Sequence, residues 1–384
     1  MTHVPFAAPS IGEDEIAAVT EILRSGWIGT GAVAADTEQD FRKYLGVEHC
    51  LLLNSGTAAL HLALASLGVT AGDEVIVPTV TFTATAATVV HVKAHPVLVD
   101  VEAETLTIDV AAVRQAITAR TRAVIAVHFA GRLADMVALR SLCDTHGLLL
   151  IEDSAHALPA QRDGVAPGQV SDAAAFSFFV TKPLTSAEGG LLTLRDSRAA
   201  ATARMLSTHG IDRGAYSRFE FGRSPHYDVV TPGFKYNLPD FAAALLRIQL
   251  GRATALRDHR RRTAEFYSTQ LAGVPGLILP APDTDDNASS WYLYVVHLPE
   301  GVDRDAVAAL MHARGVGTSV HLRPLHQFSA YRNLPGARGL GGYPVADAAF
   351  PRLLSLPIFP AMTEDDRRTV ARTFLAVLAE VRGG

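Results

Sequence analysis

Cysteine is scarce in this chain of 384 residues, which contains only Cys50 and Cys143. Two cysteines cannot form a disulfide framework or a cysteine-based zinc site. Long apolar runs are also missing, since no uninterrupted run approaches the ~18 residues that a membrane-spanning helix needs. The N-terminus lacks the basic start and the apolar core of a signal peptide. These absences predict a soluble cytoplasmic protein without a membrane partner.

An excess of positive charge is absent too, because the formal net charge is -5 at pH 7. Such a chain has no general attraction to phosphate backbones, which argues against nucleic acid as a partner. Hydrophobic residues make up 48% of the chain and charged residues 19%, whereas a disordered protein has fewer apolar residues and more charge. We therefore expect a globular enzyme, with a length that suggests two or three domains.

Short β-branched runs alternate with helical stretches up to about residue 195. The predicted strands are residues 75–77, 97–100, 123–127, 148–151, 174–178 and 191–194, and the predicted helices between them are residues 57–67, 109–117 and 134–146. Continuous apolar strands separated by helices predict an α/β fold, with a mainly parallel sheet covered on both faces. Ligands collect at the carboxyl ends of the strands in such sheets.

The two ends of the chain show other patterns. Ser10 and Glu13 have the spacing of a capping box, which predicts the start of a helix that Gly26 ends. The last third of the chain predicts a loop, three helices and a strand: a long loop at 210–233, helices at 241–271, 304–314 and 364–381, and a strand at 291–298. We expect a large domain of residues 1–244 and a smaller α+β domain of residues 245–384.

Two strand ends bear groups that suit a phosphorylated ligand. Gly56 and Thr57 follow an apolar run and open a helix, where backbone N–H groups and the helix dipole favour an anion. Ordinary helix capping is the alternative for these residues. Asp153 follows the run 147–151 and lies where sites form in open α/β sheets. An acid in an exposed loop, or one that caps a helix, explains this position equally well.

Lys182 follows the strand at 174–178 and has apolar neighbours in sequence, which can desolvate its amine for Schiff-base chemistry. The alternative is an ordinary surface lysine. A phosphate cradle, a carboxylate and a lysine at one edge of a sheet together match the needs of pyridoxal phosphate (PLP). Phe82 follows the strand at 75–77 and can stack on the cofactor ring, unless it only packs in the core.

Eight stretches in order along the chain resemble the DegT/DnrJ/EryC1/StrS family of nucleotide-sugar aminotransferases. They are SGWIGTG (25–31), NSGTAALHLAL (54–64), GDEVIVPTVTFTAT (72–85), HPVLVDV (95–101), VHFAGRLADM (127–136), IEDSAHA (151–157), FSFFVTKPLTSAEGG (176–190) and TPGFKYNLPDFAAAL (231–245). The resemblance implies the aspartate-aminotransferase fold (PLP fold type I), a three-layer sandwich. GFKYNLPD and SAEGG resemble in particular the enzymes that aminate C4 of a UDP-4-keto-pentose in the aminoarabinose pathway.

The resemblance also implies roles for individual residues. Lys182 forms the Schiff base and Asp153 pairs with the pyridine nitrogen. The remaining cofactor residues are Gly56, Thr57 and Ser177 at the phosphate, Phe82 on the ring, His156 beside the ring hydroxyl, and Lys235 and Asn237 reaching the phosphate of a neighbouring subunit. Trp27, His321 and His326 are expected at the substrate, and the two histidines lack the third ligand of a metal site.

The chain departs from the family pattern in places. Lys235 stands where many relatives have asparagine, Asn237 stands where they have arginine, and Phe179 replaces a frequent histidine. The predicted reaction moves an amino group from glutamate to a nucleotide-linked keto sugar, in a homodimer with shared sites. The alternatives are a sugar dehydratase, whose relatives have histidine in place of Lys182, a cysteine desulfurase and a non-catalytic sugar-nucleotide sensor.

Overall fold

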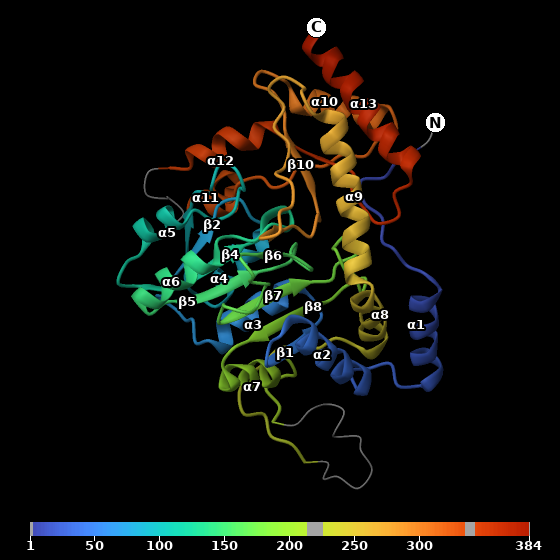
Figure 1. Cartoon of the computed structure of the whole chain (residues 1–384). Helices are drawn as coiled ribbons and strands as arrows, with labels where there is room; N and C mark the ends of the chain where they lie inside the picture. Colours follow the sequence, from blue (N-terminus) through green and yellow to red (C-terminus); the bar gives the residue numbers. More distant parts are fainter. Residues whose placement is uncertain (1–2, 213–225, 335–341, 384) are drawn as a thin grey trace.

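The computed structural model describes residues 3–212, 226–334 and 342–383. A seven-stranded sheet in the order β1-β8-β7-β5-β4-β2-β3 lies at its centre (Figure 1). The strands are β1 (His49–Leu53), β2 (Glu74–Pro78), β3 (His95–Val99), β4 (Thr121–Val127), β5 (Leu149–Asp153), β7 (Ala173–Ser177) and β8 (Gly190–Leu194). Only β8 runs antiparallel to its neighbours β1 and β7, so the predicted, mainly parallel sheet is confirmed.

Helices cover both faces of the sheet because alternate residues of its strands point to opposite sides. Val75 and Val77 of β2 belong to one core cluster, whereas Ile76 belongs to another. The first cluster includes residues of α3 (Gly56–Ser66), α4 (Thr83–His91) and α7 (Ser197–Leu206), and clusters on the opposite face include residues of α2 (Ala32–Leu45), α5 (Val110–Ala116), α6 (Met136–His146) and α8 (Asp240–Gly251). The predicted helices α3, α5 and α6 and the three-layer arrangement are confirmed.

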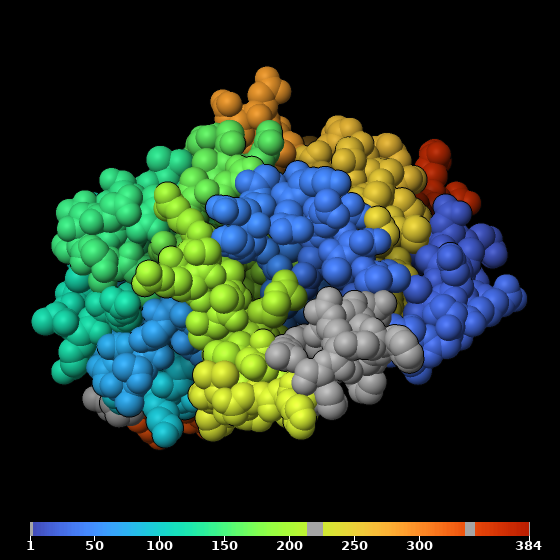
Figure 2. Space-filling model, turned by 90° about the horizontal axis from the view of Figure 1, so that it is seen from below, coloured from blue at the N-terminus to red at the C-terminus, as the bar shows by residue number. Residues whose placement is uncertain are grey.

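The helices α2, α4 and α7 were not predicted from the sequence. In α4 the segment TATAATVVH is rich in threonine and valine, which have low helix propensity. Tertiary packing overrides that preference, because Ala86 and Val89 are fully buried in the main core. From below, the blue residues around α2 lie beside the yellow-green residues around α7 (Figure 2). An ion pair of 2.7 Å between Glu38 and Arg204 joins these two helices.

The C-terminal part forms a separate core around Tyr267, Tyr294 and Phe374. Its main elements are α9 (Ala253–Leu271), β10 (Tyr294–His297), α10 (Arg304–Ala313), β11 (Leu353–Leu356) and α13 (Glu364–Gly383), with β10 and β11 paired antiparallel. The short elements are η1 (Phe129–Gly131), β6 (Gln161–Arg162), β9 (Asn287–Ala288), η3 (Leu325–Gln327), α11 (Ser329–Arg332), α12 (Pro344–Ala349) and η4 (Phe350–Arg352). The division after residue 244 falls within α8 and stays a prediction.

The prediction of one long helix in the last third of the chain was wrong. The single helix expected at 241–271 is two helices, because Arg252 has φ -100° and ψ 2° and separates α8 from α9. Gly251, which precedes the break, is a poor helix former, and the break lets α8 pack on α1 (Glu13–Ser25) while α9 enters the C-terminal core.

The predicted capping box of Ser10 and Glu13 is out of register. Gly12 is the N-cap of α1, and its backbone N–H donates to Glu15 Oε2 at 2.9 Å. Ser10 Oγ instead accepts from Arg252 Nη2 at 3.0 Å. Of the predicted loop at 210–233, residues 213–225 lie outside the described residues. Within the described part of the chain, no helix is long and apolar enough to cross a membrane.

Candidate active site

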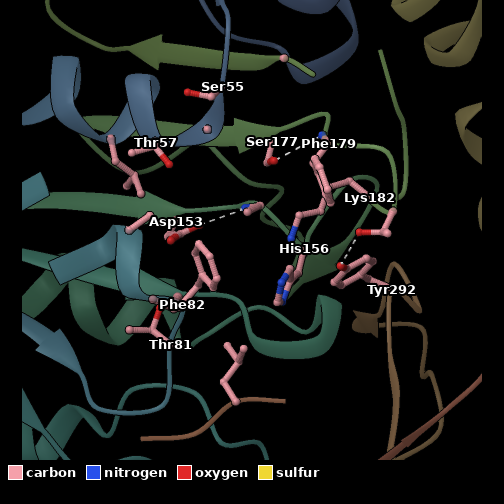
Figure 3. A pocket seen from close by; sticks show the side chains of 18 of the residues that line it. Ser55, Thr57, Thr81, Phe82, Asp153, His156, Ser177, Phe179, Lys182 and Tyr292 are labelled. Atoms are coloured by element: carbon pink, nitrogen blue, oxygen red, sulfur yellow. Dashed lines mark hydrogen bonds between the residues drawn. The ribbon is translucent and has the colours of Figure 1, made fainter. Parts of the chain in front are cut away.

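A cavity of ≈ 390 Å³ opens at the carboxyl ends of the parallel strands. Predicted site residues from five separate segments line it: Gly56, Thr57, Phe82, Asp153, His156, Ser177, Lys182 and His321. Tyr292, which no local pattern predicted as a site residue, lines it as well (Figure 3). The fold therefore gathers at one edge of the sheet the groups that the sequence suggested at separate strand ends.

The start of α3 meets the end of β7 at one side of the cavity. Ser55 is the N-cap, and its hydroxyl accepts from the backbone N–H of Ala58 at 3.1 Å. A Cβ atom at Gly56 would lie 2.9 Å from Cβ of Ser177 and 3.2 Å from the carbonyl oxygen of Phe176, so only glycine fits. Backbone N–H groups of a first helical turn lack intrahelical acceptors and, with the helix dipole, favour an anion. This corner suits a phosphate group.

Asp153 is the last residue of β5 and is buried. Its Oδ2 accepts a hydrogen bond from the hydroxyl of Thr85 at 2.7 Å, and its Oδ1 accepts from the backbone N–H of Ala155 at 3.2 Å. The Phe82 side chain extends into the cavity beside Asp153, and 59% of it is exposed (Figure 3). A core role for Phe82 is thereby excluded, and its ring is open to stacking.

Lys182 lies in the loop between β7 and β8, with its Nζ 4.6 Å from the centroid of the Tyr292 ring. The hydroxyls of Tyr292 and Thr181 are 3.2 Å apart. The expected apolar surroundings are one-sided, because Phe178 is buried whereas 42% of Phe179 is exposed. The lysine is half-buried, and its amine faces the cavity (Figure 3).

Two histidines approach Lys182. Burial, and then the charge of Lys182, hold the pKa of His156 well below its ordinary value, and the same causes lower the pKa of His321 to about 4. The ring centroid of His156 is 4.4 Å from that of Tyr292, and its buried Nδ1 has no hydrogen-bond partner within the described residues. Nδ1 of His321 lies 2.9 Å from the Ser355 hydroxyl. Both imidazoles are therefore neutral near pH 7.

The remaining predicted residues do not line this cavity. Nδ1 of His326 is 2.7 Å from the hydroxyl of Thr79, and its Nε2 is 2.9 Å from Oδ1 of Asp347. Lys235 donates to the side chain of Asn237, whose amide donates to Thr30 at 2.5 Å. Trp27 lies against Gly31. Lys235 nevertheless lies beside the start of α3, because its backbone carbonyl accepts a hydrogen bond from Nδ2 of Asn54 at 3.2 Å.

The arrangement fits PLP. The crowded helix start can hold the phosphate, Asp153 can face the ring nitrogen, Phe82 can cover the ring, and the orphaned Nδ1 of His156 is available for a ring substituent. The model of the DegT/DnrJ/EryC1/StrS aminotransferase family matches residues 9–375. The chain belongs to this family.

Three relatives illustrate the similarity of this aminotransferase to known proteins. The spore coat polysaccharide biosynthesis protein SpsC of Bacillus subtilis is 40% identical over 367 residues, which are 94% of this chain and 94% of that protein. The PMP form of the putative sugar aminotransferase Spr1654 from Streptococcus pneumoniae is 33% identical, with a TM-score of 0.91 over 98% of this chain and 100% of that one. DesV of S. venezuelae, solved with a ketimine intermediate, is 35% identical, with a TM-score of 0.85 over 96% of this chain and 94% of that one.

The prediction of a PLP-dependent sugar aminotransferase is confirmed by the family and these relatives. When bound, PLP supplies an electron sink for the carbanion chemistry of transamination. A desulfurase needs a reactive cysteine, whereas burial raises the pKa of Cys50 and of Cys143 to about 12. Neither cysteine lines the cavity.

Proposed function

We propose that this aminotransferase moves the amino group of L-glutamate to C4 of a nucleotide-linked 4-keto sugar. The observation that carries the proposal is that Lys182, Asp153 and the Gly56–Thr57 corner face one cavity. Its walls also include groups that suit a sugar. The segments GFKYNLPD (233–240) and SAEGG (186–190) support the C4 position and a UDP-linked pentose, through their resemblance to enzymes of the aminoarabinose type.

Lys182 is the residue that moves protons. Its amine is the only amine or guanidinium among the described residues that line the cavity, and a freed lysine amine there can take a proton from one carbon and return it to another. Asp153 would pair with the protonated ring nitrogen of the cofactor through its negative charge. Hydrogen bonds from Thr85 and from the backbone of Ala155 fix the orientation of its two oxygens.

Two groups on the cavity wall are suited to sugar hydroxyls. Since Nδ1 of the neutral His321 bonds to Ser355, its Nε2 is the nitrogen left for a substrate hydroxyl. Glu188 is exposed at the cavity and offers a carboxylate that accepts hydrogen bonds. Its loop is tight, because Ser186 Oγ donates to the carbonyl of Glu188 at 2.9 Å. Hydrogen-bonding groups of this kind suit the hydroxyls of a sugar ring.

The active enzyme in this proposal is a homodimer with two shared sites. The Gly56–Thr57 corner offers neutral donors, and a phosphate dianion calls for a cation that the cavity lacks apart from Lys182, as far as the described residues go. Lys235 of the second chain supplies that cation. Phe179, which lines the cavity, is 42% exposed, and this apolar surface favours a partner there.

The test is a substrate panel followed by mass spectrometry. Purified enzyme with PLP and glutamate receives 4-keto and 3-keto sugars, as pentoses and 6-deoxyhexoses, linked to UDP or dTDP. We expect the mass of an amino sugar only with glutamate and a 4-keto substrate, and no product with the Lys182→Ala variant. Amination of 3-keto sugars alone would overturn the C4 assignment. Loss of water without amination would favour the dehydratase, and binding without turnover would favour the sensor.

A further inference from the structure

Two buried threonines flank Phe82 where α4 begins. The hydroxyls of Thr81 and Thr85 are 2.7 Å apart, and the hydroxyl of Thr85 is 2.7 Å from Oδ2 of Asp153. Thr85 is fully buried and only 2% of Thr81 is exposed, although Thr81 lines the cavity. A short chain of hydroxyl groups thus leads from the cavity wall to the carboxylate of Asp153.

The direction of this chain follows from the donors available. A carboxylate only accepts hydrogen bonds, and a hydroxyl has one proton to donate. Thr85 therefore donates to Asp153, and the contact between the two threonines is a hydrogen bond from Thr81 to Thr85. Consecutive hydrogen bonds polarise one another and strengthen the last one, which here ends on a charged group.

We infer that Thr85 is a positioning residue for Asp153 and that Thr81 supports it by orienting the Thr85 hydroxyl. This inference rests on the proposed role of Asp153 at the ring nitrogen of the cofactor. Thr85 holds Oδ2 from α4, while the backbone N–H of Ala155 holds Oδ1 from the other side. One donor on each oxygen sets the plane of the carboxylate. A carboxylate that is already oriented towards its partner does not have to reorient during the reaction.

The same turn of α4 also places Phe82. Thr81 and Thr85 lie on either side of Phe82 in the sequence, and Phe82 is the N-cap residue of α4. Their hydrogen bond closes the turn that presents the Phe82 ring to the cavity. The hydroxyl pair thereby connects the group expected on the cofactor face with the group expected at the cofactor nitrogen.

Helix α4 offers a matched control. Thr88 lies one turn after Thr85 and is also fully buried. Its hydroxyl donates to the backbone carbonyls of Ala84 at 3.0 Å and of Thr85 at 3.3 Å, and among the described residues it makes no hydrogen bond to Asp153. Thr85→Val and Thr88→Val therefore remove the same group from the same helix at the same burial, and only the first change removes a hydrogen bond to Asp153.

The first experiment uses the cofactor-free protein and measures urea unfolding. A double-mutant cycle combines Thr85→Val with Asp153→Ala, and a parallel cycle combines Thr88→Val with Asp153→Ala. We expect the unfolding constant to show a coupling of about tenfold or more for the first pair, since a hydrogen bond to a charged group is worth that much. The second pair should couple by less than about twofold. Equal couplings in both cycles would overturn the inference.

The second experiment measures steady-state kcat and KM of the PLP-loaded enzyme with glutamate and the 4-keto sugar that it aminates. Thr85→Val should lower kcat about tenfold or more and leave the KM of the keto sugar unchanged, whereas Thr85→Ser should restore the rate and Thr88→Val should keep it. Thr81→Val, which leaves Thr85 in place, should give a smaller loss and serves if Thr85→Val does not fold. Full kcat in both Thr85→Val and Thr81→Val would overturn the inference. If Asp153→Ala alone keeps full turnover, the proposed role of Asp153 fails, and with it the positioning role, whatever the unfolding cycles show.

Discussion

The ammonium of Lys182 lies over the ring of Tyr292, with 4.6 Å between Nζ and the ring centroid. A cation is attracted to the face of an aromatic ring, so Tyr292 holds the amine at the cavity wall. The loop that contains Lys182 is also held by α9, because the buried Arg260 donates a hydrogen bond to the carbonyl of Pro183 at 3.0 Å. The C-terminal part of the chain thus positions a lysine of the loop between β7 and β8.

Replacing Lys182 with alanine should abolish transamination. We expect turnover to fall by at least about 10³-fold, because the Schiff-base amine and the proton carrier are lost together. The fold should persist, since the side chain is half-buried and packs little. Initial rates, cofactor absorbance and thermal unfolding check this result, with Lys43→Ala on the exposed side of α2 as the control. Undiminished turnover would remove the central assignment.

Replacing Asp153 with asparagine should separate cofactor binding from chemistry. The cofactor should stay bound, whereas turnover should fall by about 10²- to 10⁴-fold, because a neutral amide cannot keep the ring nitrogen protonated. The hydrogen bond from Thr85 can persist, so the fold should change little. Cofactor stoichiometry by absorbance and single-turnover rates with glutamate measure the two effects. A variant as fast as the wild type would mean that another acid faces the nitrogen.

Gly56→Ala should weaken the phosphate corner. The new Cβ would lie 2.9 Å from Cβ of Ser177, so the start of α3 must shift away from β7. We expect a destabilisation of about 1–3 kcal/mol and weaker PLP binding. Gly251→Ala is the control, because a Cβ atom there meets nothing within 4 Å. Urea unfolding and PLP titration of the cofactor-free protein report both effects, and equal behaviour of the two variants would contradict the crowded corner.

The buried histidines should make the enzyme sensitive to acid. The pKa of His321 falls from its ordinary 6.5 to about 4 on folding, because burial opposes its charge. Between these pH values the unfolded chain binds a proton that the folded chain does not, so stability decreases as the pH falls from 6.5 towards 4. Burial of His156 acts in the same direction. His321→Gln should flatten this loss.

The measurement is the free energy of unfolding in urea at a series of pH values from 7 to 4. The control is His146→Gln, which changes an exposed histidine at the end of α6. The control should follow the wild-type curve, while His321→Gln should lose less stability in acid. Parallel curves for the wild type and His321→Gln would show that His321 is not the group that titrates.

The shared-site dimer predicts complementation between two inactive variants. Lys182→Ala and Lys235→Ala, each slow alone, should regain activity when mixed under conditions that allow subunit exchange. A hybrid dimer places both lesions in one site and leaves the other site whole. Activity and light scattering measure the effect, with each variant incubated alone as the control. No recovery after proven exchange, or an active monomer, would exclude a shared site.

Much of the sheet was predictable from sequence because its signals are local. Continuous apolar runs identify buried parallel strands, and β4, β5 and β7 begin and end within two residues of the predicted bounds. The positions of Asp153 and Lys182 follow from the same patterns, since each lies within four residues of the end of such a run. The N-cap of α1 is displaced from the predicted Ser10 to Gly12, because several residues near a helix start can compete for the cap.

The sequence alone determined the fold class, the strand ends and the family motifs, including the lysine and the carboxylate, because each depends on residues close together in the chain. Only the tertiary structure decided which distant residues meet them. Thr85 reaches Asp153 across 68 positions, and Tyr292 reaches Thr181 across 111. These contacts depend on how α4 and the C-terminal core pack against the sheet. Packing is a property of whole surfaces, and no spacing of nearby residues encodes it.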